Sequence, residues 1–210
     1  MNIHFSKNIA AMLLCLLYAL NGFCGDKPVK PITGTWINLA YQDVRNKYTN
    51  PTVSDNTGPE LWEQKVQELH EMGMEYLVFM AVANEGRAYY PSLLMPHVYP
   101  EGRKSPVDAI MDAAARFGMK VFMSTGWAKD QDDNLRDPAI RRRQQEMMQE
   151  LAGLYGHHPA LYGWYLPVED CLCPLLSEHA VTAVNALTDK ARSLTPVSYT
   201  HLTLPTILLV

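Results

Sequence analysis

One carboxylate in this sequence stands where acid–base chemistry would need it. Glu169 lies near the end of the segment GWYLPVED at residues 163–170, directly after a run rich in aromatic and apolar residues. Such surroundings raise the pKa of a carboxyl group by desolvation, and the adjacent Asp170 would raise it further by like-charge repulsion. A carboxyl group that holds its proton near neutral pH can act as a general acid. The alternative is that Glu169 is an ordinary solvated loop carboxylate.

Aromatic and polar side chains at the ends of four apolar runs could bind a sugar. Aromatic rings can stack on the C–H faces of a sugar, while amides and carboxylates hydrogen-bond to its hydroxyl groups. Any one of these aromatic rings could instead simply cap the hydrophobic core. The predicted substrate-binding residues are Trp36, Asn38, Glu85, Tyr90, Trp127 and Tyr165.

The runs that would position these side chains alternate with helical segments. The apolar runs begin at Ile32, Met74, Met119 and Ala160. Near-continuous apolar runs are typical of parallel strands that are covered on both faces. The alternation of strand and helix therefore predicts a parallel sheet with right-handed crossovers. The intervening helices are expected to begin at Pro59, Ser105, Asp137 and Ser177, and each ends near a Gly or Pro.

A doubly wound open sheet and a (β/α)8 TIM barrel both fit this alternation. Residues 41–58 form a long polar loop after the first run, where a doubly wound nucleotide-binding sheet would have a Gly-rich turn. Long loops after strands suit the active-site face of a barrel. We therefore predict an α/β fold, a TIM barrel represented by about its first four β–α units. In the fourth strand, Gly163, Tyr165 and Glu169 are expected to face inward, and Tyr162 and Trp164 outward.

The two ends of the chain are not expected to belong to the fold. Residues 1–25 have the layout of a secretory signal peptide, with Lys7 before an apolar run and small residues after it. Cys24 could be a lipoprotein-type acylated cysteine, and plain signal cleavage is the alternative. We expect residues 26–31 to be a linker and residues 32–196 to be the partial barrel. Residues 197–210 resemble read-through of a sequencing adapter, although they could also be a genuine strand.

Composition and charge exclude several classes of protein. The chain has 210 residues, 48% of them hydrophobic, and its 18 Lys+Arg against 22 Asp+Glu give a net charge of −4. These values exclude an intrinsically disordered chain and show no basic footprint for nucleic acid. His157 and His158 are adjacent, and Cys171 and Cys173 lack zinc spacing. We therefore predict no metal site and no cofactor.

Four segments resemble the DUF4434 family, a glycoside-hydrolase-like TIM-barrel family of exported bacterial proteins. They are GTWIN at 34–38, YYPS at 89–92, SPVDAIMDAAARFGMKVF at 105–122 and ELAGLYGHHPALYGWYLPVED at 150–170. The resemblance implies a (β/α)8 barrel that acts on carbohydrate, with Glu169 matching the strand-4 acid/base carboxylate of many glycosidase barrels. Glycoside hydrolysis normally needs a second carboxylate. Glu85 or Asp130 could supply it only if the site were arranged differently from the sites of related barrels.

Taken together, these features predict a glycoside-hydrolase-like protein that acts on an extracellular or periplasmic glycan, with Glu169 as general acid/base. The alternative is a non-catalytic carbohydrate-binding protein on the same scaffold. The expected partner is a carbohydrate, with no nucleic acid, and with membrane contact only through a lipid anchor at Cys24. The expected location is the periplasm or the cell surface.

Overall fold

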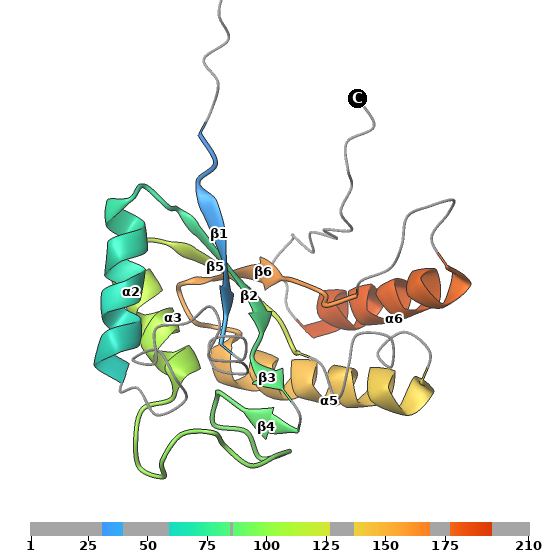
Figure 1. Cartoon of the computed structure of the whole chain (residues 1–210). Helices are drawn as coiled ribbons and strands as arrows, with labels where there is room; N and C mark the ends of the chain where they lie inside the picture. The colour runs from blue at the N-terminus through green and yellow to red at the C-terminus, as the bar shows by residue number, and fades with distance from the viewer. Residues whose placement is uncertain (1–30, 40–58, 85, 127–136, 169–176, 195–210) are drawn as a thin grey trace, which may run out of the picture. The chain divides into compact units, whose positions relative to one another are not determined.

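The computed structural model describes residues 31–39, 59–84, 86–126, 137–168 and 177–194. The chain divides into two units, residues 1–32 and 33–210, and the elements below belong to the second. Its central sheet has four parallel strands in the order β1-β2-β5-β6 (Figure 1). All four lie within the predicted apolar runs, so the predicted parallel sheet is confirmed: β1 (Gly34–Asn38), β2 (Tyr76–Ala81), β5 (Lys120–Met123) and β6 (Leu161–Trp164).

Four helices alternate with these strands, and their starts follow from capping residues in the sequence. The Oγ of Ser105 accepts a hydrogen bond from the backbone N–H of Asp108 at 3.0 Å. Asp137 and Ser177 cap later helices in the same manner, because a side-chain oxygen satisfies an N–H that has no partner within the helix. The helices are α2 (Pro59–Glu71), α3 (Pro106–Arg116), α5 (Pro138–Tyr155) and α6 (Glu178–Leu194).

The hydrophobic core lies between one face of the sheet and these helices. Alternate residues of β2 are buried, namely Leu77, Phe79 and Ala81, while the residues between them are half-buried. The buried strand residues join a cluster with side chains from all four helices, among them Val66, Ile110, Met148 and Leu187. Figure 1 shows the helices arranged around the strands. None of the helices described is long and apolar enough to cross a membrane.

The opposite face of the sheet carries a cluster of aromatic residues. The ring of Tyr162 lies 5.2 Å from that of Phe122 and 5.8 Å from that of Tyr76, measured between ring centroids. The Nζ of Lys120 lies 4.7 Å from the centroid of the Tyr162 ring, a cation–π distance. These rings alternate with the residues that enter the helix-covered core, so they mark the face that would be the inside of a barrel.

The expectation that Tyr162 points outward is wrong. Val121 pairs with Leu161, but the next residue, Phe122, pairs with Gly163, so Tyr162 is an additional residue in β6. Such a bulge breaks the period of two that the prediction assumed. It brings Tyr162 onto the inner face, whereas Trp164 packs into the core with 2% of its surface exposed.

A close backbone approach beside the sheet requires a glycine. Gly126 follows β5 and has a φ of 127°, in the range that favours glycine. A Cβ at this position would lie 2.1 Å from the carbonyl oxygen of Ala83 in β3 (Ala83–Asn84). Gly126 thus allows the end of β5 to pack directly against the segment that leaves β2.

We expect Gly126→Ala to lower the free energy of unfolding by roughly 3 kcal/mol or more, because it adds both backbone strain and overlap with a carbonyl. The matched control is Gly153→Ala in α5, where a new Cβ meets nothing within 4 Å. That change should stabilise the protein by about 0.5–1 kcal/mol, since Ala favours a helix over Gly. Urea denaturation measures the free energy of unfolding of both variants. Equal values for Gly126→Ala and Gly153→Ala would contradict the close approach at Gly126.

Helices α2 and α3 are joined at the surface by a small network of charges. Glu63 of α2 contacts Lys104 and Arg116, both at 3.0 Å, and Lys104 also contacts Asp112 at 2.9 Å. Hydrogen bonds, above all the one from Lys104, lower the pKa of Glu63 below its ordinary value. Asp112 has a lowered pKa for the same leading reason.

The lowered pKa of Glu63 predicts a pH-dependent effect on stability. Its contribution is fully present above the unfolded-state pKa, near 4.5, and is lost as the pH falls through the lower folded-state value. Glu63→Gln should therefore destabilise the protein slightly at pH 7, and the difference from wild type should shrink at pH 3. Because Glu63 and its partners Lys104 and Arg116 lie at the surface, 0.5 M salt should also reduce the difference in stability between Glu63→Gln and the wild type. A difference that grows on acidification would refute the assignment.

Candidate functional site

Two predicted sugar-binding aromatics meet on the inner face of the sheet. Trp36 in β1 and Tyr165, just beyond β6, have ring centroids 4.7 Å apart and cross at 84°. This edge-to-face geometry is a favoured one for aromatic pairs. Half of the Trp36 surface is exposed, whereas Tyr165 is only 6% exposed. The pair therefore offers an aromatic surface to solvent and is supported from beneath by packing.

Polar groups lie at the carboxyl ends of the neighbouring strands. Ser124, which follows β5, is buried and donates its Oγ–H to the carbonyl oxygen of Met80 in β2 at 3.0 Å. The Nδ2 of Asn38 lies 3.8 Å from the sulfur of the same methionine. Asn38, Met80 and Ser124 thus form a layer above Trp36, Val78 and Phe122, which share a register across the three strands.

The chain between β6 and Glu169 is held close to the sheet. The N–H of Tyr165 donates to the carbonyl oxygen of Met123 at 2.7 Å, which extends the β5–β6 pairing by one step. The N–H of Val168 then donates to the carbonyl oxygen of Leu166 at 2.8 Å, and both residues are buried. Glu169, the predicted acid/base, is the next residue and lies outside the described part of the chain, so its role stays a prediction.

Tyr90 lies in a different environment from the other predicted sugar-binding residues. It is fully buried, and its hydroxyl donates a hydrogen bond to Oε2 of Glu150 in α5 at 2.8 Å. Burial and the neighbouring carboxylate raise the pKa of the Tyr90 hydroxyl well above its ordinary value. Tyr90 is therefore a protonated hydrogen-bond donor within the fold. These contacts give it a structural role, and nothing in them brings it to the Trp36–Tyr165 pair.

The remaining predicted residues fall outside the described segments. Glu85, Trp127 and Asp130 belong to this group, and the expectations for them are unchanged. Strands β3 and β4 (Arg87–Ala88) pair in antiparallel fashion, with Asn84 opposite Arg87. Among the described residues, no three His, Cys, Asp or Glu side chains gather so that they could hold a metal ion.

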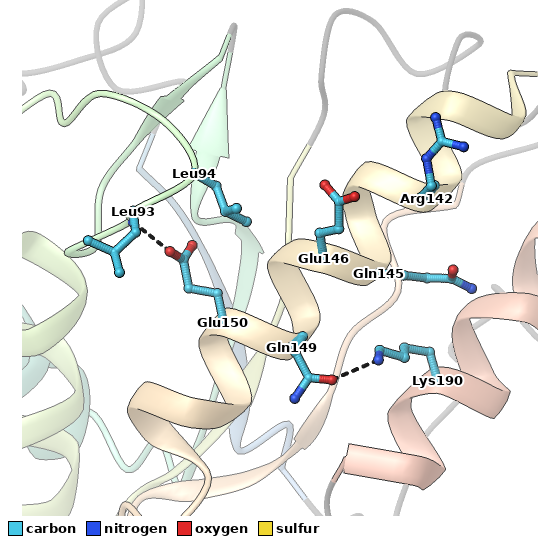
Figure 2. A pocket seen from close by; sticks show the side chains of 8 residues that line it. All are labelled: Leu93, Leu94, Arg142, Gln145, Glu146, Gln149, Glu150 and Lys190. Atoms are coloured by element: carbon cyan, nitrogen blue, oxygen red, sulfur yellow. Dashed lines mark hydrogen bonds between the residues drawn. The ribbon is translucent and has the colours of Figure 1, made fainter.

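A pocket of about 530 Å³ lies along helix α5, and Figure 2 shows the side chains that line it. The loop after β4 forms one wall, and Lys190 of α6 lies opposite, where its Nζ donates to Oε1 of Gln149 at 2.8 Å. The lining contains none of the predicted sugar-binding residues. It consists of Leu93, Leu94, Arg142, Gln145, Glu146, Gln149, Glu150 and Lys190.

Sequence reasoning missed Glu150. As one charged residue on a long helix, it has the signature of a solvent-facing side chain, and no spacing rule distinguishes it from Glu146 on the same helix. Its three hydrogen-bond donors come from a loop about 60 positions earlier in the chain. Only the folded chain brings them to it.

Comparison with other proteins relates this arrangement to known folds. Residues 32–202 match the family described as "Domain of unknown function (DUF4434)". A candidate alpha-L-fucosidase from Bacteroides thetaiotaomicron VPI-5482 is similar in structure, with a TM-score of 0.58 and 17% identity over 82% of this chain and 53% of that one. A glycoside hydrolase family 5 protein from Bacteroides vulgatus ATCC 8482 matches with a TM-score of 0.49 and 13% identity, over 68% and 31%. No curated protein matches the sequence.

At such low identity the likeness concerns the fold alone, and it confirms the predicted fold class. The described elements are four β–α units of a TIM barrel. The chain spans about half the length of the fucosidase-like structure that it matches, 53% of it.

The contact between Trp36 and Tyr165 can be measured by a double-mutant cycle. We expect Trp36→Ala and Tyr165→Leu to be less than additive in their effect on unfolding, with a coupling of about 0.5–1.5 kcal/mol from the aromatic contact. The control cycle combines Tyr165→Leu with Trp62→Ala in α2, whose side chain packs in the core on the other face of the sheet, and should show additive effects. Additivity in the Trp36–Tyr165 cycle would be incompatible with the contact.

Proposed function

The chain belongs to the DUF4434 family, and on that premise we propose that it acts on a carbohydrate as a glycoside-hydrolase-like protein, with Glu169 as general acid/base. The observation that carries the proposal is the Trp36–Tyr165 pair. Its half-exposed indole lies on the inner face of the sheet, and the buried segment after Tyr165 continues directly to Glu169. Binding of a sugar needs an aromatic platform of this kind, and its protonation needs a carboxyl group, which we assign to Glu169.

The chemistry assigned to Glu169 is proton donation. Hydrolysis begins when a carboxylic acid protonates the glycosidic oxygen of the leaving group, while a second carboxylate acts as nucleophile or activates water. A strand rich in aromatic and apolar residues favours the protonated form of Glu169 before the reaction. Trp36 and Tyr165 would hold the sugar ring, and Asn38 would hydrogen-bond to a sugar hydroxyl. The second carboxylate would come from a later β–α unit than the four described.

The proposed substrate is an extracellular or periplasmic glycan. The signal-like layout of residues 1–25 supports export, and Cys24 offers a site for a lipid anchor. Cell fractionation, with and without Cys24→Ala, tests the location and the anchor separately.

A second candidate is carbohydrate binding without catalysis. The Trp36–Tyr165 surface supports it, because stacking on an aromatic ring needs no carboxylate. The two candidates differ in what they require of Glu169. Catalysis depends on its proton, whereas binding depends mainly on the indole of Trp36.

We expect Glu169→Gln to reduce hydrolysis of a responsive oligosaccharide by about 10²-fold or more, because a sugar alcohol leaves only when its glycosidic oxygen is protonated. The matched control is Glu178→Gln, an exposed carboxylate in the first turn of α6. Hydrolysis and oligosaccharide binding are both measured, the latter by isothermal titration calorimetry. Undiminished turnover in Glu169→Gln would remove the acid assignment. Binding that Trp36→Ala abolishes, without hydrolysis by the wild type, would favour the second candidate.

A further inference from the structure

One carboxylate joins the loop after β4 to helix α5. Glu150 accepts three hydrogen bonds, all from this loop: from the hydroxyl of Tyr90 at 2.8 Å, from the hydroxyl of Ser92 at 2.7 Å and from the backbone N–H of Leu93 at 2.5 Å. Figure 2 shows the Glu150 side chain directed from α5 toward Leu93. Hydrogen bonds to a charged acceptor are roughly twice as strong as neutral ones. The three bonds therefore hold the loop in a specific geometry, and each is stronger than a hydrogen bond to a neutral acceptor would be.

Further contacts hold the same loop in place. Arg143, two turns earlier on α5, donates to the carbonyl oxygen of Leu94 and pairs with Glu146 at 3.3 Å. A ring nitrogen of His97 lies 2.9 Å from the carbonyl oxygen of Ser92. The loop is thus bound to α5 at successive residues, and Glu150 contributes the largest share of these bonds.

The loop is continuous with the hairpin at the carboxyl end of β2. The N–H of Tyr89 donates to the carbonyl oxygen of Val82 at 2.9 Å, next to Tyr90. Ala88 both donates to Pro96 and accepts from Val98, so the outgoing chain is tied to the hairpin. A contact that fixes Tyr90 and Ser92 therefore also fixes β3 and β4.

The two ends of this contact fall in segments that the sequence already singled out. Tyr90 and Ser92 belong to YYPS at residues 89–92, and Glu150 begins the segment at 150–170 that ends with Glu169 and Asp170. Glu150 therefore links the segment after the second barrel strand to the helix that leads into the fourth.

We infer that Glu150 is a positioning residue, which locks the loop of residues 89–94 against α5 and so holds the β3–β4 hairpin over the carboxyl ends of the strands. The hairpin follows β2 directly in the chain, and its paired residues Asn84 and Arg87 bear a carboxamide and a guanidinium. The consequence for sugar binding rests on the proposed function, whereas the lock itself does not.

The test is Glu150→Gln in the full chain. The side-chain amide keeps the shape of the carboxylate but replaces one acceptor oxygen with a donor, so the three loop donors can no longer all be satisfied. We expect amide hydrogen exchange in residues 83–98 to accelerate at least tenfold, with exchange in α2 and α3 unchanged. Tyr90→Phe, which removes a single donor, should give a smaller acceleration of exchange at the same amides. This variant decides the test if Glu150→Gln does not fold.

Glu68→Gln is the matched control, because Glu68 also accepts two side-chain hydrogen bonds, but both come from its own helix α2. It should leave exchange in residues 83–98 unchanged. Unaltered exchange in both Glu150→Gln and Tyr90→Phe would overturn the lock, and so would acceleration spread evenly over the whole chain.

A ligand measurement separates the lock from the site. For an oligosaccharide that binds the wild type, Glu150→Gln should raise Kd about tenfold and Glu68→Gln should not. An unchanged Kd with a loosened loop would overturn the positioning role at the site. If the wild type binds no carbohydrate, the proposed function fails, and hydrogen exchange alone decides the lock.

Discussion

Each parallel strand of this protein must be followed by a connection that returns the chain to the same end of the sheet. Helices α2, α3 and α5 supply these connections between the four strands, and all four helices, by packing on one face, bury the alternating residues of the strands. The other features depend on this arrangement, because it brings the carboxyl ends of all four strands together at one edge. Side chains from different strands, such as Trp36 in β1 and Tyr165 just beyond β6, can therefore meet.

The face of the sheet that points away from the helices carries a different set of side chains from the core. Tyr76, Phe122 and Tyr162 cluster there with Lys120, and Trp36, in register with Phe122, meets Tyr165 just beyond β6. In a closed barrel such a face becomes the interior, which side chains fill in layers. Aromatic rings on this face therefore serve two purposes, packing and an exposed platform.

The loops at the carboxyl ends are held by polar contacts. Glu150 accepts hydrogen bonds from three donors in the loop after β4. Gly126 allows the end of β5 to approach the backbone of Ala83 closely. Loops that carry functional side chains need such supports, because their own apolar contacts are few. Tyr90, which the sequence presents as a sugar-binding aromatic, belongs to this supporting structure in the fold.

Local patterns in the sequence were sufficient for the four strands of the parallel sheet, the four helices and the fold class, but they did not predict the β3–β4 hairpin. Ser105 and Asp137 mark helix starts through hydrogen bonds within a few residues, and Pro106 marks one through its fixed φ. The apolar runs mark buried strands through their composition. The orientation of Tyr162 and the partners of Tyr90 could not be read in this way. A bulge depends on the register of a neighbouring strand, and the Glu150 contact joins segments about 60 residues apart. The sequence alone determined the strands and helices of the β–α units, and the tertiary structure decided which side chains meet, because those contacts depend on distances that no local pattern records.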